Sequence, residues 1–274
     1  MEELTMLKPN AKLRESTKLL REMVATQTNK MQLDIILSVI ALAPDDAAEF
    51  YEYTIPLSEF CKIVCPSNPR AKKEEVRKAV SKIVFSGFWI RSEKEEAAYH
   101  FVETAKINYE TGTVKFKISN EVAKFYLTIK DNQTIYALKD MLAMHTIFQA
   151  NVFSWCMANS GFKNEVLIKI EDAKLAFNGE KPIETYKFIE KLKDAVATIN
   201  EKTPLQVSFK PKKNGRNIET LIFTIKNNYP KEKKTMKDKE IKDEPDQAEK
   251  EEKSPCADCQ RPYCKGCPDY PAEE

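Results

Sequence analysis

The sequence predicts an α+β protein in which one short arrangement of helices and strands occurs twice, ahead of a charged tail. Three observations indicate this fold class. Helix-like and strand-like periodicities alternate between residues 31 and 228, both halves of this range show the same order, and charged side chains dominate beyond residue 229. With 274 residues, of which 42% are hydrophobic, the chain is long enough for two small domains.

The first unit is expected at residues 31–119, after an N-terminal helical extension at residues 1–30. A dense apolar run predicts a buried helix, and an alternating stretch before Pro56 predicts a strand. A short helix follows, and then Asn68 and Pro69 mark the entry to a longer helix that ends at Gly87. In chain order, the expected elements are a helix at 31–42, a strand at 51–55, helices at 57–64 and 70–86, and strands at 88–91, 99–107 and 113–118.

The second unit is expected at residues 120–228 and repeats this plan. It begins with a connecting helix at 120–129 and a long helix at 134–159. A short helix at 170–177 stops at Asn178-Gly179, and Lys181-Pro182 opens a helix at 183–201. The segments 205–210 and 218–226 read as two strands joined by a basic turn. Both units thus resemble a helix-turn-helix followed by a β-hairpin, which is the order of a winged helix.

Several classes of protein are disfavoured. The chain has only six glycines and no glycine-rich phosphate loop, which disfavours an ATPase or a dinucleotide-binding enzyme. Its two histidines stand 45 positions apart, which disfavours a nickase that holds its metal with a local histidine pair. It begins without the basic segment of a secretory signal, and its longest apolar run, residues 33–43, is too short to span a bilayer. Three scattered cysteines suit a reducing compartment. We therefore expect a cytoplasmic protein that is not an enzyme and has no membrane partner.

The long helix of each unit has an apolar stripe and a polar face. In the second unit the expected stripe is Ile183, Tyr186, Ile189, Leu192, Val196 and Ile199. The expected reading face there is Glu184, Lys187, Lys191 and Asp194, and in the first unit it is Arg70, Lys73 and Arg77. A major groove admits one helix, and both basic and acidic side chains can contact base edges. The alternative is that these faces are simply solvated.

The hairpin of the second unit favours nucleic acid. Residues 202–217 hold five basic side chains and no acidic one. Such a tip can follow the phosphates beside a helix that lies in the groove, and Gly215 supplies the freedom that the turn needs. The basic residues are Lys202, Lys210, Lys212, Lys213 and Arg216.

The chain resembles the iteron-binding plasmid replication initiators over roughly residues 31–228. The resemblance rests on Ile199-Asn-Glu-Lys-Thr, the strand after it, the turn Lys212-Lys-Asn-Gly-Arg216 and the final strand that ends at Phe223, and also on Tyr53-Thr-Ile-Pro-Leu-Ser-Glu-Phe60. The turn is one residue longer than the usual Lys-x-Gly-Arg of the family. Residues 1–30 and the tail depart from the family pattern.

The resemblance implies a protein that binds direct repeats, called iterons, in double-stranded origin DNA. The family implies reading by Glu184, Lys187, Lys191 and Asp194, phosphate contacts by the basic hairpin, and a first unit that contacts DNA through Arg70, Lys73 and Arg77 or forms the inactive homodimer. Bound initiators would open the origin and recruit the host helicase and initiator proteins, and DNA binding would need no cofactor. The alternative is a winged-helix repressor or autoregulator without replication activity.

The tail forms a separate part of the sequence. Residues 229–253 are expected to be a disordered charged linker, and residues 254–274 form a cysteine-rich tail. Cys256, Cys259, Cys264 and Cys267 form two C-x-x-C pairs, whose four thiolates suit tetrahedral zinc. An iron–sulfur cluster, a redox-active or inert tail, and a metal-dependent or redox enzyme centred on these thiols are the alternatives.

Overall fold

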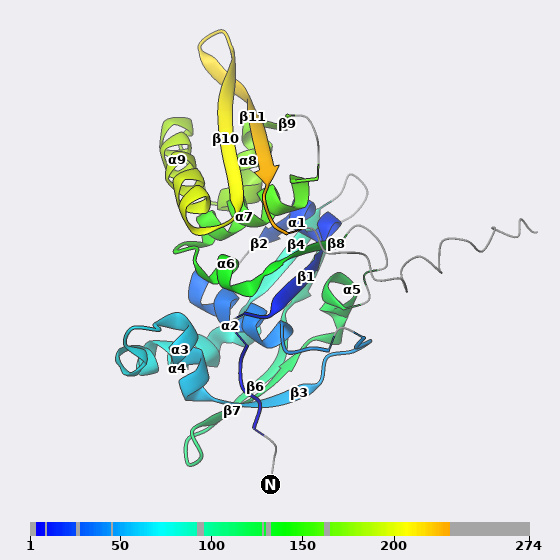
Figure 1. Ribbon diagram of the computed structural model, residues 1–274, viewed down its shortest axis with the longest axis vertical. Helices are drawn as coiled ribbons and strands as arrows, with labels where there is room; N and C mark the ends of the chain where they lie inside the picture. The colour runs from blue at the N-terminus through cyan, green and yellow to red at the C-terminus, as the bar shows by residue number, and fades with distance from the viewer. Residues whose placement is uncertain are drawn as a thin grey trace, which may run out of the picture. The chain divides into compact units, whose positions relative to one another are not determined.

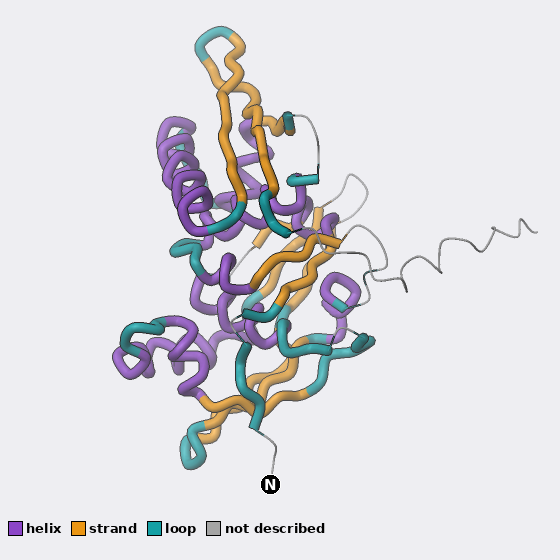
Figure 2. The backbone as a smooth tube through the Cα atoms, viewed as in Figure 1, coloured by secondary structure: helices purple, strands orange, loops and turns teal. Residues whose placement is uncertain are grey.

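Two copies of one helix and strand order make up most of the described chain. The computed structural model describes residues 4–8, 10–25, 28–44, 46–91, 96–127, 129, 133–161 and 165–230. The first copy consists of α2 (Lys30–Ile40), β3 (Glu52–Pro56), α3 (Leu57–Val64), α4 (Lys73–Lys82), β6 (Val102–Asn108) and β7 (Thr113–Ile118). The second consists of α7 (Ile147–Asn159), β9 (Val166–Lys169), α8 (Ile170–Asn178), α9 (Thr185–Lys202), β10 (Leu205–Asn214) and β11 (Asn217–Asn227). Figures 1 and 2 show these elements on the ribbon and the tube.

The two sheets have the same topology. In the first copy β7 lies between β3 and β6, and in the second β11 lies between β9 and β10, with every pairing antiparallel. The strand before the helix-turn-helix thus pairs with the last strand of the hairpin in both copies. This arrangement confirms the predicted α+β fold with two tandem winged helices.

The beginning of the chain differs from the expected helical extension. Residues 12–25 form β1 (Lys12–Ser16), α1 (Thr17–Glu22) and β2 (Met23–Ala25), so only the middle part is helical. Strand β1 pairs with β8 (Gln133–Ala137), and β2 joins β4 (Gly87–Arg91), which also pairs with β5 (Glu96–His100). Leu13 and Glu15, at alternate positions of β1, both have buried side chains, as in a strand with one face in the core.

The long helix expected at 134–159 is also wrong. The segment instead forms β8, α6 (Leu138–Leu142) and α7. Buried Thr134 and Tyr136 alternate along β8, and α7 starts afresh because the Thr146 side chain accepts a hydrogen bond from the Gln149 backbone N–H. The expected connecting helix is present but short: α5 spans Ala123–Tyr126 after a 3₁₀ turn.

A single hydrophobic core runs through both winged helices. In the second, the aromatic rings of Trp155, Phe177, Phe188 and Phe223 join α7, α8, α9 and β11. Cys61 and Cys156 are buried free thiols, as expected of scattered cysteines. No helix in the described part of the chain is both long and apolar enough to cross a membrane. The linker and cysteine-rich tail expected at 229–274 lie almost wholly outside the described residues.

Candidate nucleic-acid interface

Helix α9 buries one face against the rest of the second winged helix. Its buried side chains are Phe188, Leu192, Ala195, Val196 and Ile199. Tyr186, which we expected in this stripe, is 60% exposed. The buried stripe therefore passes through Phe188 and not through Tyr186. The solvent-facing side of α9 is rotated about the helix axis by the same amount.

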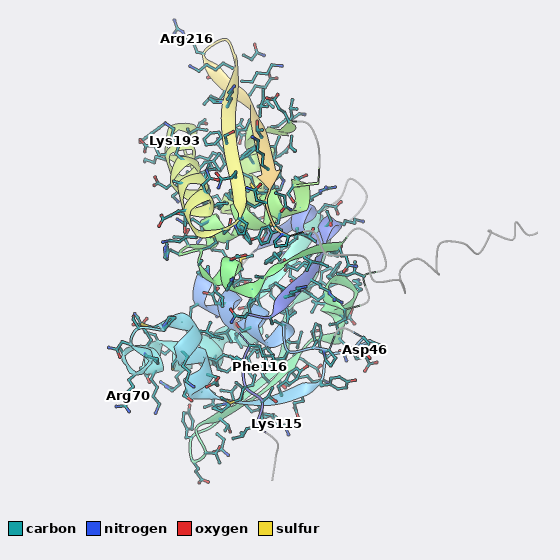
Figure 3. All side chains as sticks on the ribbon, viewed as in Figure 1. Asp46, Arg70, Lys115, Phe116, Lys193 and Arg216 are labelled. Atoms are coloured by element: carbon teal, nitrogen blue, oxygen red, sulfur yellow. The ribbon has the colours of Figure 1, made fainter. Side chains whose placement is uncertain are left out.

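The outward face of α9 differs in part from the predicted reading face. Glu190, Asp194 and Ala197 each lie two residues from a buried residue on either side, and at 3.6 residues per turn this places them opposite the core. Tyr186 and Lys193 flank them, and Figure 3 shows Lys193 on the outer side of α9. The sequence signal that could have identified Lys193 is the position of Phe188, which sets the inward direction.

The four predicted readers are exposed: Asp194 lies on the outward face of α9, and Glu184, Lys187 and Lys191 occupy the shoulder that leads towards α7. Glu184 occupies the N-cap position of α9 without a side-chain capping bond, and its carboxylate lies 2.9 Å from the Lys187 Nζ. Lys191 lies with its Nζ 5.8 Å from the centroid of the Phe148 ring. Lys191 and Asp194 also line a cavity of about 320 Å³ beside the first turn of α7. Of the three on the shoulder, Lys187 lies nearest the outward face.

The hairpin β10–β11 lies on the other side of α9. The Asn200 side chain accepts a hydrogen bond from the Val207 N–H (2.7 Å) and donates one to the Val207 carbonyl (2.9 Å). These bonds fix the helix against the root of the hairpin. On the opposite shoulder, Gln149 of α7 donates to the Thr198 hydroxyl at 3.2 Å. The outward face of α9 is thus bounded by the hairpin on one side and by α7 on the other.

The hairpin carries all its predicted phosphate contacts on exposed positions. Its turn follows a register shift at Lys212/Lys213, and Gly215 adopts a φ of 61°, which favours glycine. The hairpin runs past the end of α9 in Figure 1, and Arg216 is at its tip in Figure 3. The four exposed cations at and near the tip are Lys210, Lys212, Lys213 and Arg216.

In the first winged helix, α4 occupies the place that α9 has in the second. It buries Val76, Ala79 and Val80. Lys73 is exposed, and Arg70 is exposed in the 3₁₀ turn Pro69–Lys72, before α4 begins. The structure therefore places Lys73 on the helix but not Arg70.

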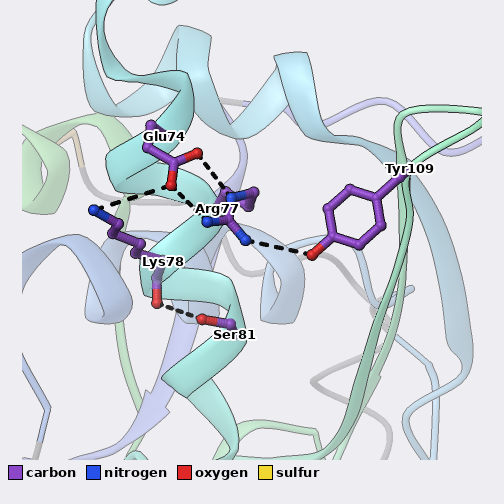
Figure 4. A network of polar contacts seen from close by, with 5 residues as sticks. All are labelled: Glu74, Arg77, Lys78, Ser81 and Tyr109. Atoms are coloured by element: carbon purple, nitrogen blue, oxygen red, sulfur yellow. Dashed lines mark hydrogen bonds and ion pairs between the residues drawn. The ribbon is translucent and has the colours of Figure 1, made fainter.

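Arg77 is engaged with two neighbouring side chains. It donates to the Glu74 carboxylate from Nε at 2.8 Å and from Nη2 at 2.5 Å, and to the Tyr109 hydroxyl from Nη1 at 3.4 Å (Figure 4). Glu74 and Tyr109 were not among the predicted site residues. An acid at i−3 from Arg77 was visible in the sequence, but the approach of Tyr109 follows from tertiary structure alone.

The two hairpin tips differ in charge. The tip of the first winged helix, Tyr109–Gly112, holds one acid and no basic side chain, and Tyr109 is 71% exposed. The tip of the second is basic. The two winged helices share one topology but present different chemistry beside their reading helices.

Two family models match the chain. One is described as "Initiator Replication protein, WH1" and matches residues 12–157, and the other as "Initiator Rep protein, WH2" and matches residues 184–225. The first alone covers more than half of the chain. The chain belongs to this family of replication initiators. The first model begins at residue 12, so in the initiator the segment from β1 to β2 is part of the matched region.

One solved structure supports the fold of the initiator, and a second is reported for its similarity alone. The structure of the Pi initiator protein in complex with iteron DNA is 17% identical, covers 79% of this chain and 97% of that chain, and has a TM-score of 0.62. A structure of domains 2 and 3 of RctB is 11% identical, covers 73% of this chain and 81% of that one, and has a TM-score of 0.45. No curated protein matches the chain.

The predicted metal ligands lie outside the described residues. Cys256, Cys259, Cys264 and Cys267 all fall in the segment whose structure is not described. Within the described ranges, no group of three or more His, Cys, Asp or Glu side chains could hold a metal ion.

Proposed function

We propose that the protein initiates replication of a plasmid by binding direct repeats in its double-stranded origin DNA. The observation that carries the proposal is the exposed outer face of α9 beside a long hairpin whose tip is basic and free of acids, in a chain of the initiator family. One helix fits a major groove, and the hairpin cations are suited to the adjacent phosphates. The iteron DNA bound by Pi, which has the same fold, supports this partner.

Replication itself is the decisive measurement. A plasmid with no other origin should replicate in a permissive host when it carries the gene and its flanking DNA. Direct repeats spaced by about two helical turns beside the gene would accord with this result. Absence of replication, with the protein expressed and folded, would contradict the proposal and favour the alternative, a winged-helix repressor or autoregulator that binds promoters only.

Binding measurements separate reading from phosphate contacts. Lys193→Ala on the outward face of α9 should weaken binding to the cognate repeat by about 1–3 kcal/mol, with little change on random DNA. Lys213→Ala should weaken binding to all sequences and reduce the salt slope by about one. Lys18→Ala, an exposed lysine on α1, is the control for loss of charge.

The paired change Lys187→Ala with Lys191→Ala tests the shoulder of α9 that leads towards α7. If this pair lowers specificity and Lys193→Ala does not, the reading face is the one first predicted from the sequence. Equal losses on cognate and random DNA for all three lysines would mean that α9 is not the reading helix.

We further propose the events that follow binding. Bound initiator opens the adjacent origin and recruits the host helicase and initiator proteins, the homodimer is the inactive state, and the protein acts in the cytoplasm as a binding protein without catalysis. The family membership supports these steps. Mixing the folded protein with purified host helicase and origin DNA, and probing for unpaired bases, tests opening and recruitment together.

We propose zinc as the ion of the cysteine-rich tail. The two C-x-x-C pairs supply four thiolates at a spacing that suits a tetrahedral ion. Protein purified in reductant should contain about one zinc per chain, and truncation after Lys253 should remove the zinc without loss of DNA binding. Stoichiometric iron with visible absorbance would indicate an iron–sulfur cluster instead, and metal-free protein would indicate a tail that binds no metal.

A further inference from the structure

We propose that Glu74 and Tyr109 are positioning residues that hold Arg77 of α4 to read one guanine in the major groove. The inference rests on the proposed function, because it requires that the first winged helix contacts the repeat. Arg77 is already an expected DNA contact of the first winged helix; the inference adds the base that it reads and the two side chains that orient it.

The hydrogen bonds leave Arg77 with a defined set of free donors. A guanidinium has five N–H groups. The Nε and Nη2 edge faces the Glu74 carboxylate at 2.8 and 2.5 Å, and Nη1 faces the Tyr109 hydroxyl at 3.4 Å. Three donors are engaged, and two remain, one on each terminal nitrogen. Two donors in one plane match the O6 and N7 acceptors that guanine presents in the major groove.

The anchors come from two different elements. Glu74 lies one helical turn before Arg77 on α4, and Tyr109 is in the turn between β6 and β7. Figure 4 shows the guanidinium between the two. An arginine held from both sides loses less side-chain entropy when it binds a base. It should therefore discriminate guanine from the other bases more strongly than a free arginine does.

The charges of the network disfavour a phosphate as the partner. Glu74 also has the Lys78 Nζ at 4.0 Å, and its bond to Arg77 lowers the pKa of the carboxyl, so it stays ionised. A negative charge beside Arg77 opposes the approach of an anionic phosphate but not of a neutral base edge. The hairpin tip beside it, Tyr109–Gly112, also lacks the cations that a phosphate contact would use.

The position of Glu74 directs the network outward. Glu74 is two residues before the buried Val76, and this places it on the side of α4 opposite the core. Its neighbour Glu75 forms a similar exposed ion pair, with Lys72 Nζ at 2.7 Å, on another side of the helix. The side chains of Glu74 and Glu75 are 60% and 55% exposed, respectively. They differ mainly in their ion-pair partners, which are Arg77 for Glu74 and Lys72 for Glu75.

The test compares variants of the full chain on DNA. Duplexes are first selected from a random pool by the wild-type protein, and each base pair of the selected site is then substituted in turn. Wild type should show one G·C position, outside those affected by Lys193→Ala, where substitution lowers affinity about 10- to 100-fold. Arg77→Lys should remove discrimination at this position, and Glu74→Gln and Tyr109→Phe should each reduce it several-fold there.

Glu75→Gln is the matched control, because it removes the same charge from the same helix. It should leave the discrimination at every position unchanged. The proposal is overturned if Glu74→Gln and Glu75→Gln behave alike, if Tyr109→Phe leaves the G·C preference intact, or if Arg77→Lys weakens all duplexes equally. Failure of the wild type to select any sequence would instead overturn the proposed function.

Discussion

At the scale of single residues, Glu15 of β1 is an acid whose carboxyl is buried in the folded chain. It is buried, with only 3% of its surface exposed, and it accepts a hydrogen bond from the Tyr136 hydroxyl. Burial raises the pKa of Glu15 to about 7, although hydrogen bonds from Tyr136 and Tyr126 oppose the shift. A charged carboxylate at this position therefore destabilises the pairing of β1 with β8.

This burial makes the stability of the protein fall as pH rises. The pKa of Glu15 is higher in the folded state, about 7, than its ordinary value of 4.5, so the folded state binds the proton more tightly. The free energy of unfolding should decrease between about pH 4.5 and pH 7, by about 3 kcal/mol from this group. Urea unfolding of wild type and Glu15→Gln at pH 5 and pH 8 measures the difference.

In this comparison Glu15→Gln should lose less stability than wild type on going from pH 5 to pH 8. Burial also raises the pKa of Asp34, to about 6, but this contribution is common to both proteins and cancels. Asp172→Asn, which removes an exposed carboxylate of α8, should behave as wild type. Parallel pH profiles for wild type and Glu15→Gln would show that Glu15 is ionised in the folded state.

Single residues also show how far the sequence predicts the interface. The spacing of hydrophobic residues correctly gave the helix and its buried Leu192, Val196 and Ile199. It assigned Tyr186 inward and did not include Phe188, because both aromatics fit a stripe when only spacing is considered. In the structure Phe188 packs against Phe148 of α7 and Phe177 of α8, and these contacts show that Phe188 and not Tyr186 marks the inward direction.

At the scale of elements, the helices of the two helix-turn-helix units and the second hairpin were predicted well, whereas the N-terminal extension, the long helix at 134–159 and the isolated short strands were not. α2, α3, α8, α9 and the hairpin β10–β11 lie within a few residues of their predicted ranges. The missed strands are β1, β2, β8 and β9, of three to five residues each. Segments this short carry too few alternations to indicate a strand, and their partners lie far away in the chain.

The contact between α9 and its hairpin should control binding as well as stability. Asn200→Ala removes both side-chain bonds to Val207, which leaves the N–H and carbonyl at the root of β10 without these partners. We expect a loss of about 1–3 kcal/mol in unfolding free energy. The affinity for the cognate repeat should fall by more than the smaller fraction of folded protein accounts for, because the hairpin is no longer fixed beside the helix.

Thermal unfolding and DNA titration, both on the full chain, measure the two effects of Asn200→Ala. Asn228→Ala, at an exposed position just after β11, is the control and should change neither. A variant that is destabilised but binds DNA with wild-type affinity under folding conditions would show that these bonds do not position the hairpin.

At the scale of the whole molecule, the segment β1–α1–β2 connects parts that belong to different winged helices. β2 pairs with β4, which lies between α4 and β6 of the first winged helix in the chain. α1 packs on α7 of the second winged helix. The Arg21 guanidinium also donates to the Ala158 carbonyl near the end of α7, at 2.7 Å. Residues 1–229 accordingly form one compact unit.

The two winged helices should therefore unfold together. The chain has two tryptophans, Trp89 in β4 and Trp155 in α7, so Trp89→Phe and Trp155→Phe leave one reporter in each half. In each variant, urea unfolding followed by fluorescence should have the same midpoint as unfolding followed by far-UV circular dichroism. Leu19→Ala, in α1 and 1% exposed, should lower the stability seen by both reporters by about 2–5 kcal/mol.

Lys18→Ala, on the exposed side of α1, controls for helix content in the same measurement. A fluorescence midpoint that differs from the circular-dichroism midpoint within one variant, or a loss confined to one tryptophan when Leu19 is truncated, would show that the halves unfold independently.

The pairing of β1 with β8 also bears on how the chain is made. Residues 12–16 leave the ribosome long before residues 133–137, their partners. During synthesis β1, whose Leu13 and Glu15 are buried in the folded chain, stays unpaired while more than a hundred further residues are added, and closing so long a loop is slow. Slow translation before residue 137 should therefore increase aggregation more than slow translation after it.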